Sequence, residues 1–173
     1  MEICPAVEPH KRSLAAEVLR STGKVRLVAR GHSMLPALWP GDLLNIEATS
    51  FDRVRAGDTV LFARDDRFLI HRVLDKHEVR HGSTRPSLVT RGDSMPQVDA
   101  PVFGEELLGR VVSFERHGHG PAAVPKCSRL RRCLGLLLGS GDRFRSLALR
   151  VHGWRSRSAA GNAQLTQTEI GSS

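Results

Sequence analysis

The sequence contains no tyrosine, and its 173 residues include only six phenylalanines and two tryptophans. A core must therefore be built from Val, Leu, Ile and Ala, which suits a domain rich in β-structure. A chain of this length is sufficient for one domain with extensions. The three cysteines, Cys4, Cys127 and Cys133, are odd in number, so they indicate neither a disulfide framework nor a metal cluster.

Long apolar runs are also missing. No stretch reaches the ~18 to 20 apolar residues that span a bilayer, and the N-terminus has no basic segment followed by an apolar one. We therefore expect a cytoplasmic protein with no signal peptide and no transmembrane segment of its own. The histidines are scattered, and the pair His117 and His119 lacks a third ligand at suitable spacing, so we expect no metal and no cofactor.

Positive charge is concentrated near the C-terminus. The chain holds 26 Lys and Arg residues against 18 Asp and Glu, a formal net charge of +8. Residues 126–157 contain nine of the basic residues and one acid, so the other residues carry 17 of each sign. We expect an anionic partner for this C-terminal part and not for the rest of the chain.

Residues 31–42 form a loop rich in proline and glycine, Gly-His-Ser-Met-Leu-Pro-Ala-Leu-Trp-Pro-Gly-Asp. Pro36 fixes its own φ and favours an extended conformation at Leu35, which holds Ser33 in one place. A Pro-Gly-Asp turn at residues 40–42 ends the loop. Such a loop can present a nucleophilic serine, but a surface turn between two strands has the same composition, and a serine is nucleophilic only beside a base.

Apolar periodicity predicts a β-rich domain around this loop, preceded by one amphipathic helix. Residues 24–30 alternate, with Val25, Leu27 and Ala29 on one face, and residues 107–115 alternate in the same way. The segment 92–101 is too rich in Asp, Pro and Gly for regular structure. The predicted elements are a helix over 9–20 with apolar Leu14, Ala15, Val18 and Leu19, strands over 24–30, 43–47, 59–63, 68–74, 78–80, 88–90 and 107–115, and a hairpin turn over 64–67.

Five short motifs follow the loop in a fixed order. They are Gly-Asp-Thr-Val-Leu-Phe at 57–62, Ile-His-Arg-Val at 70–73, Thr-Arg-Gly-Asp-Ser at 90–94, Asp99, and Leu-Gly-Arg-Val at 108–111. Together they resemble the type I signal peptidase superfamily, which also contains the LexA-type self-cleaving repressors. The resemblance covers about residues 25–114. It is strongest to the archaeal, endoplasmic-reticulum and sporulation type, where His-Arg-Val stands in place of the bacterial lysine.

The resemblance implies a mainly β fold of the signal-peptidase and LexA type, with the chemistry of a serine endopeptidase. It makes Ser33 the nucleophile and His71 the general base. In the family a Gly-Asp is followed by another Asp six positions later, a spacing that Asp93 and Asp99 reproduce. Asp99 is the favoured partner of the histidine and Asp93 a supporting residue, although the sequence alone does not separate the two roles.

Residues next to Ser33 are expected to bind the substrate, namely Gly31, His32, Met34 and Pro36. Many signal peptidases carry a serine hydroxyl two positions before the nucleophile, but Gly31 occupies that place. The backbone N–H of Ser33 is therefore the expected oxyanion donor, with a second backbone N–H or His32 beside it. The resemblance implies that the substrate is an extended segment of a protein or peptide precursor, added as a strand, with small residues before the cleaved bond.

Two alternatives stay open at this point. A self-cleaving repressor-like regulator shares the fold, but it uses lysine in place of His71, and the roughly 25 residues before the first strand are too few for a helix-turn-helix domain. A non-catalytic peptide-binding module of the same fold is the other alternative. The run of Gly, His and Pro at 117–125 is typical of a linker, so the predicted units are a helical segment 1–24, a catalytic domain 25–116, and a linker with a basic, helical and partly disordered tail 117–173.

The basic tail is predicted to form two amphipathic helical segments. Helices with an apolar stripe flanked by arginine lie at membrane interfaces, where each basic residue adds about 1 kcal/mol of attraction to anionic lipid. We therefore expect peripheral association with an anionic membrane; packing of the stripes on the β-domain is an equal alternative. Nucleic acid is a weaker partner, because only two aromatics could stack on bases. The stripes are Leu130, Leu134, Leu137 and Leu138 in the first segment, and Phe144, Leu147, Val151 and Trp154 in the second.

Overall fold

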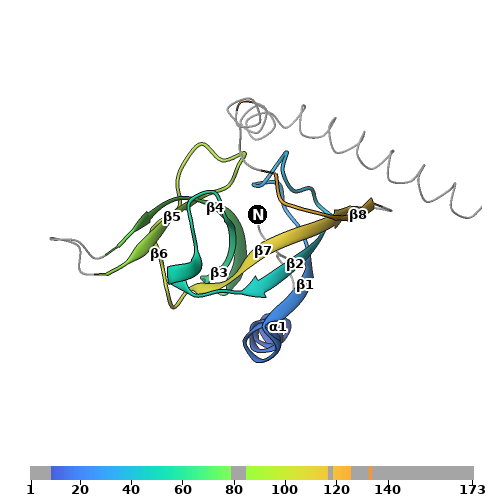
Figure 1. Ribbon diagram of the computed structural model, residues 1–173, viewed down its shortest axis with the longest axis horizontal. Coiled ribbons are helices and arrows are strands. Elements are labelled where there is room, and N and C mark those ends of the chain that lie inside the picture. Colours follow the sequence, from blue (N-terminus) through green and yellow to red (C-terminus); the bar gives the residue numbers. More distant parts are fainter. Residues whose placement is uncertain (1–8, 79–84, 117–118, 126–132, 134–173) are drawn as a thin grey trace, which may run out of the picture.

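A computed structural model describes residues 9–78, 85–116, 119–125 and 133 of the chain. Within these residues the fold is one antiparallel sheet of eight strands with a single α-helix beside it (Figure 1). The prediction of a mainly β domain is therefore confirmed. The predicted basic tail lies outside the described residues, apart from Cys133.

The elements follow one another along the chain in nearly the predicted order. The α-helix α1 spans Pro9–Thr22, and a short 3₁₀ helix, η1, spans Phe51–Arg53. The strands are β1 (Lys24–Val28), β2 (Leu43–Ala48), β3 (Thr59–Arg64), β4 (Arg67–His77), β5 (Ser87–Arg91), β6 (Val102–Phe103), β7 (Leu107–Arg116) and β8 (His119–Ala122).

The spatial order of the strands is β1-β2-β7-β3-β4-β5-β6, and β8 pairs with β7. The consecutive strands β3 and β4 pair directly with each other, whereas β7 lies between β2 and β3. In Figure 1, β3, β4 and β5 lie on one side of the molecule, β1 and β2 on the other, and α1 lies below the sheet. This arrangement brings the loop after β1 and the segment after β5 to the same end of the molecule.

A two-residue turn joins β3 to β4. Its residues, Asp65 and Asp66, have positive φ angles of 47° and 56°. This left-handed backbone matches the right-handed twist of the flanking strands, and aspartate tolerates it better than most residues. The hairpin predicted from the sequence is confirmed, and β4 continues three residues beyond the predicted end at Leu74, to His77.

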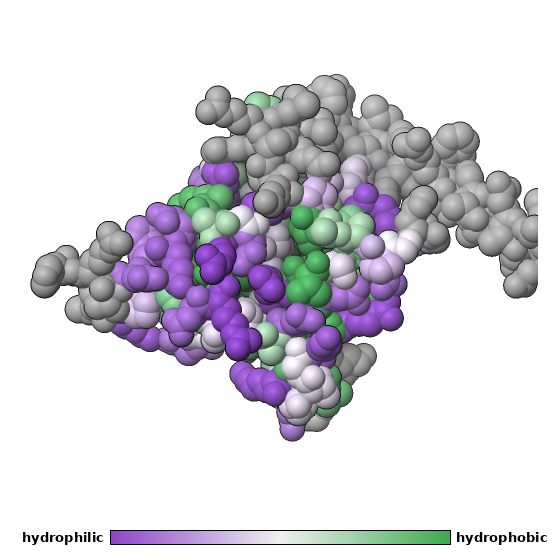
Figure 2. All heavy atoms as spheres, in the orientation of Figure 1, coloured by the Kyte–Doolittle hydropathy of each residue, from purple (hydrophilic) through white to green (hydrophobic). Residues whose placement is uncertain are grey.

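Two core clusters are built almost entirely from aliphatic residues and phenylalanine, as the composition predicts. The first contains buried residues of α1, the loop after β1 and several strands, including Phe68 and Ile70 of β4. The second contains Phe62 of β3 and Val73 of β4. Because successive strand residues point to opposite faces, β4 contributes to both clusters. Figure 2 shows that the surface in this view is mostly polar, with a smaller apolar area near its middle.

The helix α1 packs on the sheet against β1, β2 and β7. Leu19 is buried, and its side chain lies over Gly109, where any added Cβ would approach Leu19 Cδ2 to 3.1 Å and Glu47 O to 2.7 Å. Glycine at 109 thus permits the close approach of helix and strand. The predicted apolar face is wrong in one position: Leu14 is 59% exposed, whereas Ala16 is buried. The predicted helical segment therefore packs on the sheet domain where it is described.

The predicted domain boundary after residue 116 needs correction. Instead of a linker, β8 pairs with β7, with Phe114 opposite Ala122 and Arg116 opposite His119. Val124 packs against the first core cluster. The sheet domain therefore includes residues beyond the predicted linker start, because a short hairpin return is indistinguishable from a linker in a Gly- and Pro-rich stretch.

No helix in the described ranges is long and apolar enough to cross a membrane.

Candidate active site

Ser33 lies in the loop between β1 and β2, and apolar side chains anchor this loop to the domain. Met34, Leu35 and Leu38 are fully buried, and Met34 and Leu38 belong to the first core cluster. Tight turns shape the backbone, since Leu38 N–H donates to Met34 O at 3.0 Å. Ser33 itself remains partly exposed. The serine is thus presented on a rigid base at the surface.

The end of the same loop is fastened by Asp42, which is 1% exposed. One carboxylate oxygen accepts the backbone N–H of Trp39 at 2.7 Å. Arg116 of β7 donates to both oxygens at 2.7 and 2.6 Å. Asp42 therefore stabilises the end of the loop, where the sequence predicts a Pro-Gly-Asp turn, and the bidentate pair also ties the loop to β7.

The segment after β5 fastens the loop from the other side. The backbone N–H of Ser94 donates to Ser33 O at 2.9 Å, and its hydroxyl donates to His32 O at 2.8 Å. Gly92 approaches so closely that an added Cβ would lie 2.6 Å from Ser33 O and 2.9 Å from Ser33 Cβ. Only glycine fits there without moving the serine, so this segment determines the position of the nucleophile.

His71 lies on β4, opposite Val60 of β3. Its Nε2 is 3.1 Å from Ser33 Oγ. The imidazole is 8% exposed and meets the edge of the Phe62 ring, with 6.0 Å between ring centroids and 65° between planes. A central strand and a packed aromatic ring therefore hold the imidazole within hydrogen-bonding distance of the serine hydroxyl.

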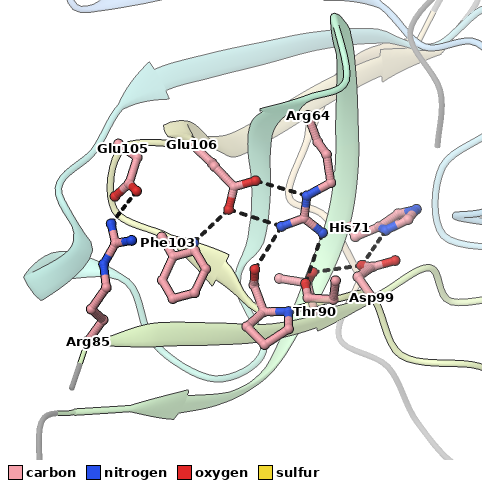
Figure 3. Close-up of polar contacts among 10 residues, drawn as sticks. Arg64, His71, Arg85, Thr90, Asp99, Phe103, Glu105 and Glu106 are labelled. Atoms are coloured by element: carbon pink, nitrogen blue, oxygen red, sulfur yellow. Dashed lines mark hydrogen bonds and ion pairs between the residues drawn. The ribbon is translucent and has the colours of Figure 1, made fainter. Parts of the chain in front are cut away.

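Asp99 completes the line of hydrogen bonds. Its Oδ2 is 2.6 Å from His71 Nδ1 and also accepts the hydroxyl of Thr90 at 2.6 Å (Figure 3). The backbone N–H of Asp99 donates to Thr90 O at 2.9 Å. A carboxylate at Nδ1 favours the tautomer with its proton on that nitrogen, which leaves the lone pair of Nε2 facing Ser33.

Burial and the carboxylate act on the imidazole in opposite directions. Burial lowers the pKa of His71 below its ordinary value, and the hydrogen bond and charge of Asp99 offset only part of this effect. Burial of Asp99 tends to raise the pKa of that carboxyl, but hydrogen bonds from His71 and Thr90 outweigh it and lower the pKa. At neutral pH the site therefore pairs a neutral imidazole with an ionised carboxylate.

Asp93, the other aspartate proposed for the site, contacts Arg72 instead of the histidine. Arg72 Nε and Nη2 donate to its two oxygens, each at 2.8 Å. The pair is almost fully buried, with side-chain exposures of 4% and 6%. Arg72 also donates to Gly57 O and Pro125 O, both at 3.0 Å. Asp93 thus fixes the course of the chain near the site through a bidentate ion pair.

The catalytic candidates come from three separate parts of the chain: the loop after β1, the strand β4 and the segment after β5. Ser33, His71 and Asp99 are nevertheless connected by two successive hydrogen bonds. No protein-family model matches the chain, and no curated protein matches it in sequence. The chemistry of the site is therefore argued from this geometry.

Two adjacent backbone N–H groups are available beside the serine hydroxyl. Within the described part of the chain, the N–H groups of Ser33 and Met34 donate to no acceptor. Gly31 precedes them with a positive φ of 77°, a conformation that glycine adopts without strain. Because Gly31 has no hydroxyl, the two N–H groups are the candidates for stabilising an oxyanion.

The residues predicted to bind substrate differ in their surroundings. Gly31, His32 and Pro36 are partly exposed, and their role in substrate binding stays a prediction. Met34 differs, because its side chain is fully buried in the first core cluster. We therefore correct its role: Met34 anchors the loop. A flexible apolar residue next to a serine suits a core position as well as a pocket wall.

Several residues at the site were not singled out from the sequence. Thr90 and Ser94 lie within the Thr-Arg-Gly-Asp-Ser motif, but nothing in their spacing indicates a hydroxyl contact with Asp99 or with the loop. Arg72 follows His71 in the Ile-His-Arg-Val motif, and its position in a buried strand could have indicated a buried partner. In the described ranges no group of three or more His, Cys, Asp or Glu side chains is placed to hold a metal ion.

Proposed function

We propose that this protein is a serine endopeptidase of the signal-peptidase type, and that its sheet domain has the corresponding fold. The observation that carries the proposal is the line of hydrogen bonds from Ser33 Oγ through the His71 imidazole to Asp99, at 3.1 and 2.6 Å. The order of motifs in the sequence and the mainly β architecture support it. The proposed substrate is an extended segment of a protein or peptide precursor.

In the proposed first half-reaction, Ser33 Oγ attacks the scissile carbonyl carbon while His71 Nε2 takes the hydroxyl proton. Asp99 stabilises the imidazolium that forms and keeps the ring oriented. The negative charge on the carbonyl oxygen is stabilised by the N–H groups of Ser33 and Met34. His71 then gives its proton to the leaving amine, and the acyl group stays on Ser33.

In the second half-reaction, water attacks the acyl carbon and His71 accepts a proton from it. The proton returns to Ser33 Oγ as the bond to the acyl group breaks, which releases the acid product and restores the site. The lowered pKa of His71 suits both steps, because the imidazole must be neutral before each attack.

Two exposed apolar side chains on the segment after β5 suggest where substrate side chains would lie. Met95 is 41% exposed and Val98 is 54% exposed, and both belong to the segment that connects Ser94 with Asp99. An atom added at Gly92 would meet both Ser33 and Met95 Cγ, so Met95 lies close to the nucleophile. We propose that these side chains flank the bound segment, whose backbone pairs as an added strand.

Replacement of the nucleophile tests the function. Ser33→Ala removes only a hydroxyl from a partly exposed position, so it should abolish cleavage of fluorogenic peptides with small residues while the melting temperature stays unchanged. Ser50→Ala is a matched control, since Ser50 is exposed and its side chain forms no capping bond; it should retain full activity. Cleavage by Ser33→Ala at the wild-type rate would rule out the proposed mechanism.

The same experiment separates the alternatives. If the wild-type protein binds the peptides without cleaving them, the non-catalytic peptide-binding module is the better description. If it cuts only its own chain, mass spectrometry will detect two fragments in the wild type and none in Ser33→Ala, which is the behaviour of a self-cleaving regulator. Turnover of added peptide supports the endopeptidase.

We also propose that the basic tail associates with an anionic membrane surface. The support is the composition of residues 126–157, with nine basic residues and one acid. The full chain should sediment with anionic vesicles but not with neutral ones, and raised salt should release it. A chain that ends at Pro125 should lose most of this binding. Equal sedimentation of both chains would show that the tail does not anchor the protein.

A further inference from the structure

Arg64 is the last residue of β3, and its guanidinium donates four hydrogen bonds (Figure 3). Two go to the carboxylate of Glu106, at 2.9 and 3.0 Å. The other two go to consecutive backbone carbonyls, Ala100 O at 2.9 Å and Pro101 O at 2.8 Å. Ala100 directly follows Asp99, so this arginine binds the stretch of chain that carries the orienting carboxylate.

The stretch that Arg64 binds belongs to no strand, since β5 ends at Arg91 and β6 begins at Val102. Its backbone therefore lacks the inter-strand hydrogen bonds that fix the position of His71. Thr90 supplies a backbone and a hydroxyl contact to Asp99 itself. The guanidinium of Arg64 binds the next two carbonyls, Ala100 O and Pro101 O. The two contacts together determine where the carboxylate lies.

Glu106 in turn fixes the position of the Arg64 guanidinium. Its Oε2 accepts the N–H of Phe103 at 2.8 Å, and its backbone carbonyl accepts the N–H of Ala63 at 2.9 Å. Arg64 and Glu106 are only 19% and 21% exposed. The hydrogen bond to Glu106 raises the pKa of Arg64 although burial opposes it, and the charge of Asp99 adds to this increase. The arginine is thus held in one orientation.

We propose that Arg64, braced by Glu106, is a positioning residue that aligns the Asp99 carboxylate with the His71 imidazole. This inference rests on the proposed function only where activity is the readout. Lysine cannot reproduce the contact, because a single ammonium group lacks the planar fork that reaches a carboxylate and two carbonyls at once.

The test compares Arg64→Lys with Arg85→Lys. Arg85 is a matched control, because it pairs with the neighbouring Glu105 and stands over the Phe103 ring, 4.6 Å from its centroid. In Arg64→Lys, kcat should fall between about tenfold and 10²-fold with little change in KM, since a small misplacement of catalytic groups has costs of this size. Arg85→Lys should leave both constants unchanged.

A second readout does not require activity. The Asp99 hydrogen bond raises the pKa of His71 against the effect of burial, so a misplaced carboxylate should lower that pKa further. NMR titration of the labelled imidazole in Arg64→Lys should detect this shift, and the Nδ1–H resonance should broaden. The same shift should appear when Arg64→Lys is combined with Ser33→Ala, which has no nucleophile.

The outcomes distinguish the proposed peptidase function from the proposed role of Arg64. A wild-type protein without hydrolytic activity would remove the proposed function, while the His71 titration would still test the role of Arg64. If Arg64→Lys is folded and keeps both kcat and the His71 titration of the wild type, Arg64 is only structural and the proposal is wrong. Should Arg64→Lys not fold, Glu106→Gln takes its place: a smaller shift in the same direction supports the proposal, and an unchanged titration overturns it.

Discussion

Asp93 and Asp99 lie on the same segment, yet they have opposite kinds of partner. Asp93 is paired with Arg72, a permanent cation, and the side chains of Arg72 and Asp93 are 4% and 6% exposed. Asp99 is paired with His71, whose charge can change, and is 20% exposed. The partners are adjacent on β4 and so point to opposite faces of the strand. The first pair holds the chain in place, and the second can take part in proton transfer.

Burial and the type of partner together decide what a carboxylate can do. A guanidinium stays protonated at any physiological pH. A buried aspartate beside it therefore has a constant counter-ion, and that counter-ion takes no part in proton transfer. An imidazole with a lowered pKa is neutral at pH 7 and can accept a proton from a hydroxyl. Substitutions at the two aspartates should therefore affect different measurable properties.

The largest effect is expected from Asp99→Asn. The amide keeps the size of the side chain but favours the wrong imidazole tautomer and cannot stabilise the imidazolium, so kcat should fall about 10⁴-fold. Thermal unfolding should change little, because the Asp99 side chain is partly exposed and the amide has the same size. Steady-state kinetics with a peptide substrate measure the loss. Wild-type kcat in a folded Asp99→Asn protein would show that His71 needs no orienting carboxylate.

Asp93→Asn should produce a loss of stability instead. It leaves the Arg72 guanidinium buried without its counter-ion, which typically costs about 3 to 5 kcal/mol in the free energy of unfolding. Urea denaturation measures this loss. The double variant Arg72→Met with Asp93→Leu, which leaves no charge, should lose less stability than Asp93→Asn. If Asp93→Asn is as stable as the wild type, the buried pair has no structural role.

A smaller effect is expected at Gly92, where the segment after β5 packs on the serine loop. Gly92→Ala places a methyl group against Ser33 O and Cβ and should displace the nucleophile. A displacement of about 1 Å lowers kcat roughly 10²-fold. Gly120→Ala is the control, since nothing lies within 4 Å of the added methyl there, and it should behave as wild type. Equal kinetics for the two variants would contradict the packing of Gly92 on Ser33.

The smallest effect concerns pH. Because burial lowers the pKa of His71 below its ordinary value of about 6.5, kcat/KM should rise with pH through a value below 6.5 and be constant at neutral pH. Protonation of the imidazole at lower pH removes the general base. Initial rates across the acidic range give the apparent pKa. An acid limb above pH 6.5 would mean that the Asp99 hydrogen bond outweighs burial.

Local sequence patterns predicted the regular parts of this fold. Apolar alternation placed β1, and runs of apolar, β-branched and aromatic residues placed β2 and the hairpin of β3 and β4. The alternation predicted for 107–115 is interrupted, since Asn45 pairs with Ser113 and Ile46 with Val111, which leaves Val112 as an extra residue. Val111 and Phe114 therefore both reach the core. A bulge of this kind has no signature in period-two patterning.

The site was predictable where a motif carried it and unpredictable where tertiary contacts built it. Ser33, His71 and the two aspartates were selected from their motifs, and the structure places His71 between Ser33 and Asp99. The partners of Asp93 and the fork of Arg64 could not be predicted, because such contacts depend on which distant segments meet. The burial of Met34 and the strand β8 depend on packing in the same way.

The two-residue turn of Asp65 and Asp66 has a consequence far from its own position. A strand that slips by one residue against its neighbour exchanges its two faces. Such a slip in one direction would carry Arg72 into the place of His71, facing Ser33 and Asp99, and it would carry Val73 into the place of Arg72, facing the buried Asp93. The positive φ angles of the turn fix the hairpin length. Two surface aspartates therefore decide whether a histidine or an arginine meets the serine.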